Sequence, residues 1–520
     1  MKITETHTDE EDQTQKTIDE KEQAHKMEDA QKTEEESKLN KPITFKFLLT
    51  FTIPTILSFI IMGIFSTIDG IFAARGISHQ AFGAINFVIP YFIFSMAIGT
   101  MMAMGGSALV AKKKGEKLFG EARENFSLII LVTFITSLVI SVVSWFLRLP
   151  LLRMLGARTG YVYFYGYGYV YDSSVFDMSL EYLQPLIFMM PFIMVGVVLV
   201  QFLIAEGRPI LGMIASSSGV MISTGLNALF LFVFDMGVMG LGLATGLGNF
   251  VPAMLGVIYF TANRKGTIYF VRPKFNIRVL GRASLNGISE AITLMATTIT
   301  SIVMNNVLVN LVGWEGVAAA GMVIAAQWLL ASLFLGYSAG IAPVVSYNYG
   351  KKLHYGKNRT VGKGRSENLR KLYKKSLLIV GILSVIAFIS TFIFSDLLIR
   401  IYVSPNDPYM GHLHEMAARG LRIVSTALVL MGFNMFATAW FTAFNDGLVS
   451  GFMSLMRTMV FTLTLFVTLP RIWNVDGVWI TLPAAEALSI VLTIFFLMKM
   501  GKKYYYRKER RMRICYPAKM

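Results

Sequence analysis

The chain has 520 residues, 54% of them hydrophobic, and its mean hydropathy is +0.56. Its apolar residues come in continuous blocks of about 20, the length of a helix that crosses a bilayer. This pattern excludes an ordinary soluble protein. The single cysteine, Cys515, excludes an intramolecular disulfide and a cysteine-based metal site.

We predict an all-α polytopic membrane protein with twelve transmembrane helices. Only helices and closed barrels satisfy their backbone groups in lipid, and these blocks are too long for barrel strands. The predicted spans are residues 44–72, 82–110, 126–148, 181–205, 209–233, 237–260, 285–311, 316–346, 376–398, 415–444, 448–470 and 477–498.

Residues 1–41 precede the first span and are rich in Glu, Lys, Gln and Thr, with a net charge of −6. We predict a disordered acidic tail, with a short surface helix as the alternative.

The first span contains Asp69, 15 residues after Pro54. No basic residue lies three or four positions away on the helix, so no local ion pair accounts for this carboxylate. An ionisable residue within a span is a functional-site hypothesis by default, and Asp69 could bind a proton or hold Na⁺. The alternative is a carboxylate that only touches water near the outer end of the helix.

The net charge of +16 does not indicate a nucleic-acid partner, because the basic residues alternate between the predicted loops. They concentrate in 111–125, 261–284, 349–375 and 502–520, which is the positive-inside pattern. We therefore predict a multi-pass protein of the plasma membrane with both termini in the cytoplasm. The basic loops, among them a linker at 263–284 and a tail at 501–520, would contact anionic membrane lipids.

The outer loop at 161–171 reads YVYFYGYGYVY. Its alternating tyrosines indicate an aromatic loop or hairpin at the membrane interface, and its role is left open.

In the second half, Glu290 lies about 12 Å inside its helix, where it could line a substrate cleft or gate, or only complement the helix dipole. Arg457 and Glu486 lie about 17–20 Å from the cytoplasmic face on adjacent helices. Because a buried lone charge is costly, we predict a structural ion pair between them.

The two halves align at a shift of 235 residues, which places Gly105 on Gly340 and Gly115 on Gly350. Each half has six predicted helices, so both would share one orientation about an axis along the membrane normal. We predict two lobes related by this pseudo-two-fold axis, at 42–262 and 285–500.

Several segments, among them IPTILSFIIMGIFSTIDGIFAARG, GGSALVAKKKGE and FVFDMGVMGLGLAT, give the chain its resemblance to a known family. The chain resembles the MATE (multidrug and toxic compound extrusion) transporters, in the branch that includes MepA-like proteins. The resemblance implies a twelve-helix, two-lobed carrier that exports amphipathic, cationic compounds in exchange for H⁺ or Na⁺.

The resemblance also implies roles for single residues. A helix 1 Asp after a bend-forming Pro is a coupling residue in the family, and the matching positions are Asp69 and Pro54. The helix 5 positions that often carry Asn and Asp match Ser223 and Asn227, so one carboxylate is missing. Thr245 matches a helix 6 Thr. Na⁺ at Asp69 would need help from Asn227 and Thr245.

We therefore predict a monomeric secondary antiporter for multidrug efflux, a cause of antibiotic resistance, with no cofactor besides the coupling ion and no enzymatic activity. Glu290, Asn434 and Gln327 are assigned to the substrate cleft or its gate. Amphipathic small-molecule drugs are the expected substrates. The alternative is a flippase for lipid-linked or polyisoprenoid substrates with the same architecture.

Overall fold

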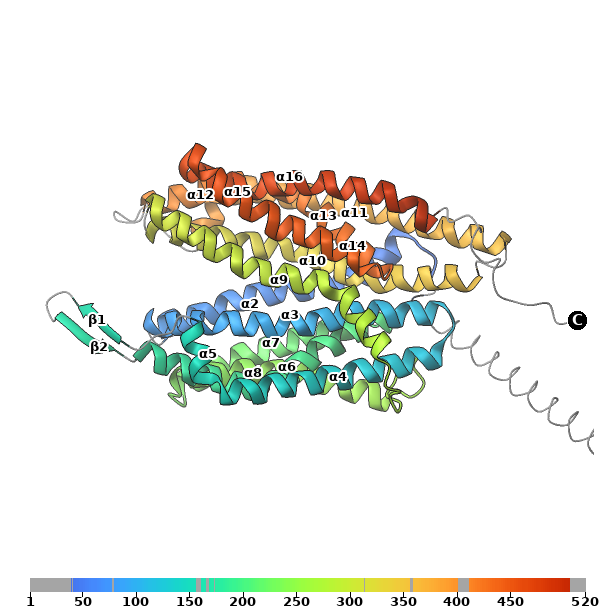
Figure 1. Ribbon diagram of the computed structural model, residues 1–520, viewed down its shortest axis with the longest axis horizontal. Coiled ribbons are helices and arrows are strands. Elements are labelled where there is room, and N and C mark those ends of the chain that lie inside the picture. Colours follow the sequence, from blue (N-terminus) through green and yellow to red (C-terminus); the bar gives the residue numbers. More distant parts are fainter. Residues whose placement is uncertain are drawn as a thin grey trace, which may run out of the picture.

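The computed structural model describes residues 39, 41–76, 79–155, 160–164, 168–172, 174–312, 314–355, 359–400 and 411–505. They form two helical bundles that lie side by side with parallel long axes (Figure 1). The first bundle, the N-lobe, contains α2 (Phe45–Gly76), α3 (His79–Gly115), α4 (Phe119–Phe146), α5 (Arg148–Met154), α6 (Ser174–Ala205), α7 (Pro209–Phe232) and α8 (Gly237–Ala262).

The second bundle, the C-lobe, contains α9 (Ile277–Val312), α10 (Trp314–Tyr355), α11 (Arg359–Arg400), α12 (Gly411–Ser425), α13 (Ala427–Ala443), α14 (Gly447–Leu455), the π-helix η1 (Met456–Phe461), α15 (Thr462–Thr468) and α16 (Pro470–Tyr505). Eleven helices of the described chain are long and apolar enough to cross a membrane. The bent pair α12–α13, with an angle of 49°, makes a twelfth if it counts as one span. The all-α polytopic fold is confirmed.

A small β-hairpin is the exception to the helical fold. Strand β1 (Gly160–Phe164) pairs antiparallel with β2 (Gly168–Asp172), and Gly160 lies opposite Asp172. The hairpin extends beyond the end of the bundle where α4 ends and α6 begins (Figure 1). Of the loop and the hairpin considered for this tyrosine-rich segment, the structure has the hairpin.

The lobes meet through glycine-mediated helix crossings. We call the end of the molecule where α3 finishes with Lys112, Lys113 and Lys114 the basic end. A Cβ atom added to Gly115 would overlap the carbonyl oxygen of Tyr347 on α10, and one added to Gly350 would overlap that of Lys112 on α3. The two backbones therefore touch at the basic end, where a side chain would force them apart.

These crossings follow the internal repeat. Gly115 and Gly350 differ by 235 positions, as do their partners Lys112 and Tyr347, so the pseudo-two-fold axis passes between the two glycines. A second crossing joins α3 to α9, where Gly105 abuts Ala283 and Gly287 abuts Met101. Its repeat-related counterpart joins α10 to α2, where Gly340 meets Thr52 and Thr55.

The linker between the lobes, residues 263–276, is fastened to the N-lobe. Glu206 accepts hydrogen bonds from the backbone N–H of Thr267, at 2.6 Å, and from its hydroxyl. The backbone N–H of Val271 donates to Ser127 Oγ at 3.0 Å, and Lys274 Nζ lies 2.7 Å from Glu124 Oε1. This hydrogen bond to Glu124 raises the pKa of the exposed Lys274 ammonium.

Lys114 anchors the same region from inside. Its side chain is fully buried, and Nζ lies 3.0 Å from Glu206 Oε2 and 3.1 Å from the carbonyl oxygen of Ala205. From the sequence we predicted that Lys114 belongs to a basic loop at residues 111–125, and for Lys114 this prediction is wrong. Helix α3 continues to Gly115, and Glu206, from a distant turn, compensates the buried charge.

We expect Lys114→Met to lower the free energy of unfolding by about 3–5 kcal/mol, because it leaves Glu206 buried without a counter-charge. Lys113→Met is the matched control. Lys113 lies on the same turn and pairs with Glu121 at 2.8 Å with both side chains partly exposed, so its loss should cost at most about 1 kcal/mol. Thermal unfolding of the purified variants in detergent measures the difference, and equal midpoints for the two would contradict it.

Candidate functional site

The polar residues assigned to the N-lobe come from α7 and α8. Ser223 and Asn227 lie one helical turn apart on α7 and are buried, with 4% and 2% of their surfaces exposed. Ser223 packs against Gly248 of α8. A Cβ atom added to Gly248 would overlap the side chain of Ser223. Thr245 is half-buried on α8 and donates to the carbonyl oxygen of Leu241 at 2.9 Å. The structure therefore places Ser223 at the α7–α8 contact, with Asn227 buried one turn further along α7.

Helix α2, which carries Pro54 and Asp69, packs against α7. The hydroxyls of Ser58 and Ser216 form a hydrogen bond between the two helices. Pro54 lies inside α2 and is buried, where its missing N–H leaves a backbone carbonyl without its helical donor. The side chain of Asp69 lies outside the described part of the chain, although the backbone of α2 is described through Gly76.

In the C-lobe, the structure brings Arg457, Glu486 and Asn434 together from three helices. Arg457 Nη1 lies 4.0 Å from Glu486 Oε1, and both side chains are more than nine-tenths buried. Asn434 donates from Nδ2 to Glu486 Oε2 at 2.6 Å, and the hydroxyl of Thr493 donates to Asn434 Oδ1 at 2.8 Å. Asn434, only 1% exposed, therefore holds Glu486 in place inside the lobe.

Arg457 is the second residue of a π-helical segment, η1, within the span formed by α14, η1 and α15. The hydroxyl of Thr462, five residues further on, donates to the Arg457 carbonyl oxygen at 2.7 Å. Neither Nε nor Nη1 of Arg457 has a hydrogen-bond partner among the described residues. π-helical turns inside α-helices often mark functional sites, and the sequence carries no signal from which we predicted this one.

The other two residues assigned to the cleft lie on the helices that cross between the lobes. Glu290 is on α9, one turn beyond Gly287, and is half-buried. Gln327 is half-buried on α10. The predicted site residues thus occupy two regions, one in each lobe.

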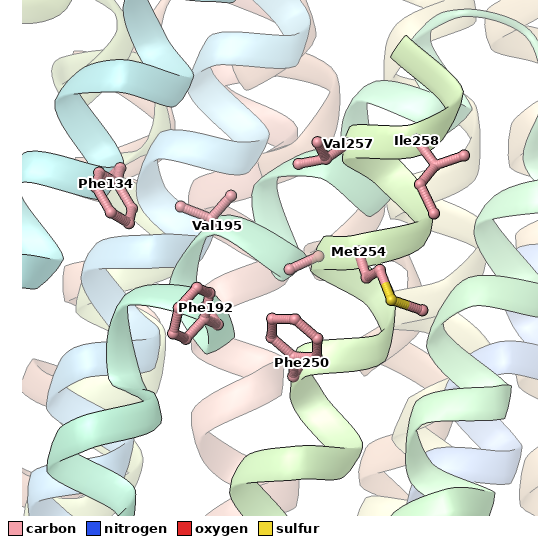
Figure 2. A pocket seen from close by; sticks show the side chains of 8 residues that line it. Phe134, Phe192, Val195, Phe250, Met254, Val257 and Ile258 are labelled. Carbon is pink, nitrogen blue, oxygen red and sulfur yellow. The ribbon is translucent and has the colours of Figure 1, made fainter. Parts of the chain in front are cut away.

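A separate apolar groove of about 300 Å³ lies on the outer surface of the N-lobe (Figure 2). It is lined by side chains of α4, α6 and α8, including Phe134, Phe192 and Phe250. Figure 2 shows these rings and Met254 around the groove. None of the residues predicted from the sequence lines it, so it is distinct from the candidate site.

The part of the chain that the structure describes contains no group of three His, Cys, Asp or Glu side chains that could hold a metal ion. The polar groups present are amides, hydroxyls, single carboxylates and one guanidinium. Such groups can bind small charged molecules.

The two six-helix lobes, related by a pseudo-two-fold axis and carrying ionisable groups at membrane depth, define a polytopic membrane transporter. A sequence profile described as MatE matches residues 54–233 and 358–467, more than half of the chain. The chain belongs to the MATE family.

Curated relatives are similar over most of this chain. The multidrug export protein MepA of Staphylococcus aureus (strain MSSA476) is 22% identical over 461 residues, which cover 88% of this chain and 95% of MepA. MepA of Staphylococcus saprophyticus is 23% identical over 466 residues.

Solved structures show the same fold. An outward-facing MATE family transporter of the MOP superfamily superimposes with a TM-score of 0.79 at 18% identity, covering 91% of this chain and 98% of that one. A MATE structure in complex with MaD3S has a TM-score of 0.78 at 18% identity, covering 89% and 98%.

Proposed function

We propose that the protein is a secondary active exporter of amphipathic, cationic compounds, which it exchanges for H⁺ or Na⁺ across the plasma membrane. The observation that carries the proposal is the arrangement of the two lobes, which are joined at glycine crossings. Each lobe has buried polar groups on the helices that lie next to the other lobe. Two lobes that rock about such a contact would expose one site to each side of the membrane in turn. The full-length similarity to multidrug export proteins supports the choice of substrate.

We assign ion coupling to Asp69 with Ser223, Asn227 and Thr245, and the helix register supports this choice. Ser58 on α2 contacts Ser216 on α7. Asp69 and Asn227 each lie 11 residues further along their helices, which is close to three full turns. Both helices run in the same direction from the basic end, so positions 69 and 227 would lie at about the same level along them.

The basic end would lie in the cytoplasm, as the distribution of Lys and Arg favours. The lobes touch at this end, so the described state would be closed towards the cytoplasm. A cation that binds Asp69 from outside would then favour the change to the inward-open state, and release of a drug outside would favour cation entry.

Reconstitution of the full chain in liposomes tests the proposal. We expect ethidium efflux when either a pH gradient or a Na⁺ gradient is imposed alone, and the effective gradient identifies the coupling ion. Protein-free liposomes are the control. The proposal is wrong if neither gradient drives transport of ethidium or tetraphenylphosphonium, and gradient-independent movement of a lipid-linked substrate in the same vesicles would favour the flippase instead.

A further inference from the structure

The apolar groove on the outer surface of the N-lobe extends beyond the part drawn in Figure 2. A second cavity, of about 370 Å³, shares Phe134 and Phe192 with it, so the two adjoin at these rings. The second cavity runs between α4 and α6 as far as Trp145, which lies near the end of α4 opposite the basic end (Figure 1). We call the two cavities together the N-lobe groove.

Helix α6 forms the floor of the N-lobe groove, and α4 and α8 form its walls. Ile187 and Val195 of α6 are buried, with 1% and 6% of their surfaces exposed. Phe134 of α4 and Val257 of α8 remain 39% and 41% exposed. Figure 2 shows these two wall residues on opposite sides of Val195. All three helices are long and apolar enough to cross a membrane, so the groove would open to the hydrocarbon of the bilayer.

The length of the N-lobe groove matches one leaflet of a bilayer. From Trp145 to Phe134 the groove follows 11 residues of α4, which is about 16 Å along the helix axis. One leaflet contributes about half of the roughly 30 Å hydrocarbon core, which is nearly the same length. An acyl chain of that leaflet therefore fits along α4, and the part of the groove between α6 and α8 has room for its end.

A cation lies where the N-lobe groove ends at Trp145. The guanidinium carbon of Arg148 is 4.8 Å from the centre of the Trp145 ring, and Nη1 donates to the Trp145 carbonyl oxygen at 2.8 Å. Among the described residues Arg148 forms no ion pair, and its Nε has no hydrogen-bond partner. Trp is typical of the membrane–water interface, and the fork of N–H groups on Arg matches the oxygens of a phosphate. The charge and its position are thus complementary to a lipid headgroup.

We propose that the N-lobe groove binds one phospholipid of the leaflet opposite the basic end, with an acyl chain along α4 and the phosphate on Arg148. Free phosphate would leave the apolar groove unfilled, and an apolar chain alone would leave the guanidinium without a counter-charge. A phospholipid supplies both parts. Because the groove separates α4 from α8, the bound lipid would hold these two helices of the N-lobe together. This site does not depend on which compound the protein transports.

Native mass spectrometry of the delipidated full chain, titrated with dioleoylphosphatidylglycerol, tests the proposal. We expect the first lipid to bind about tenfold more tightly than dioleoylglycerol, which has the same chains but no phosphate. Arg148→Gln should raise the Kd of the phospholipid by about tenfold and leave that of dioleoylglycerol unchanged. Leu138→Trp, which fills the groove from α4, should raise the Kd of both lipids, because both place a chain there.

Two matched controls should bind both lipids as the wild type does. Arg153→Gln removes an exposed charge from α5 at the same end, and Ile135→Trp adds the same ring to α4 at an exposed position that does not line the groove. Thermal unfolding midpoints without lipid verify that the variants are folded. The proposal is overturned if Arg148→Gln or Leu138→Trp binds the phospholipid with the wild-type Kd, or if the wild type binds the two lipids equally. It is also overturned if the wild type forms a dimer that Leu138→Trp abolishes, because a second copy of the chain then covers the groove.

Discussion

Asp69→Asn is expected to reduce ethidium efflux from liposomes, driven by a pH or Na⁺ gradient, to the level of protein-free vesicles. The amide keeps the size of the side chain, but it can neither take up a proton nor supply a charge to Na⁺. Binding of ethidium without a gradient should persist, because the lost function is the coupling and not the affinity for the drug.

Asp177→Asn is the matched control, since Asp177 is an exposed carboxylate in the first turn of α6 in the same lobe. It should transport at the wild-type rate. If Asp69→Asn exports ethidium normally under either gradient, the assignment of ion coupling to this position is wrong.

Gly287→Ala is expected to shift the protein away from the state in which the basic end is closed. The added Cβ would overlap the carbonyl oxygen of Met101, so α9 and α3 would have to separate. Overpacking of this kind costs about 1–3 kcal/mol, which corresponds to roughly a five- to 150-fold change in the ratio of two states.

Spin labels at Lys265 and Lys371, in a Cys515→Ser background, would report the change as longer distances between the lobes at this end. Gly281→Ala is the control on the same helix, because a Cβ there has open space around it. Its distance distribution should match that of the wild type. An unchanged distribution in Gly287→Ala would show that this crossing does not control closure.

Much of the fold could be predicted from the sequence, because apolar blocks of membrane-spanning length leave few alternatives. The alignment of Gly115 with Gly350 also marked residues that meet in space. The helix ends could not be predicted as well. Helix α9 begins at Ile277 and α11 at Arg359, ahead of their apolar blocks, because each starts with polar turns outside the membrane.

Contacts within the candidate site could be predicted only where two residues lie at the same depth in the membrane on adjacent helices. Arg457 and Glu486 were paired because helix geometry places them at one level on adjacent spans, and the structure brings them to 4.0 Å. The hydrogen bonds of Asn434 to Glu486 and Thr493 depend on side-chain packing between α13 and α16. A single sequence contains no signal for such long-range partners, and the same holds for Lys114 and Glu206.

The fastening of the linker to the N-lobe limits how far the lobes can move apart. Contacts hold the chain to that lobe as far as Lys274, and α9 of the C-lobe begins at Ile277, so only Phe275 and Asn276 span the junction. Extended chain covers at most about 3.6 Å per residue. The short tether therefore restricts separation at the basic end to roughly 10 Å, unless Lys274 detaches. A glycine–serine insertion after Phe275 would lengthen this tether, and so allow a larger separation of the lobes, without changing a residue of either bundle.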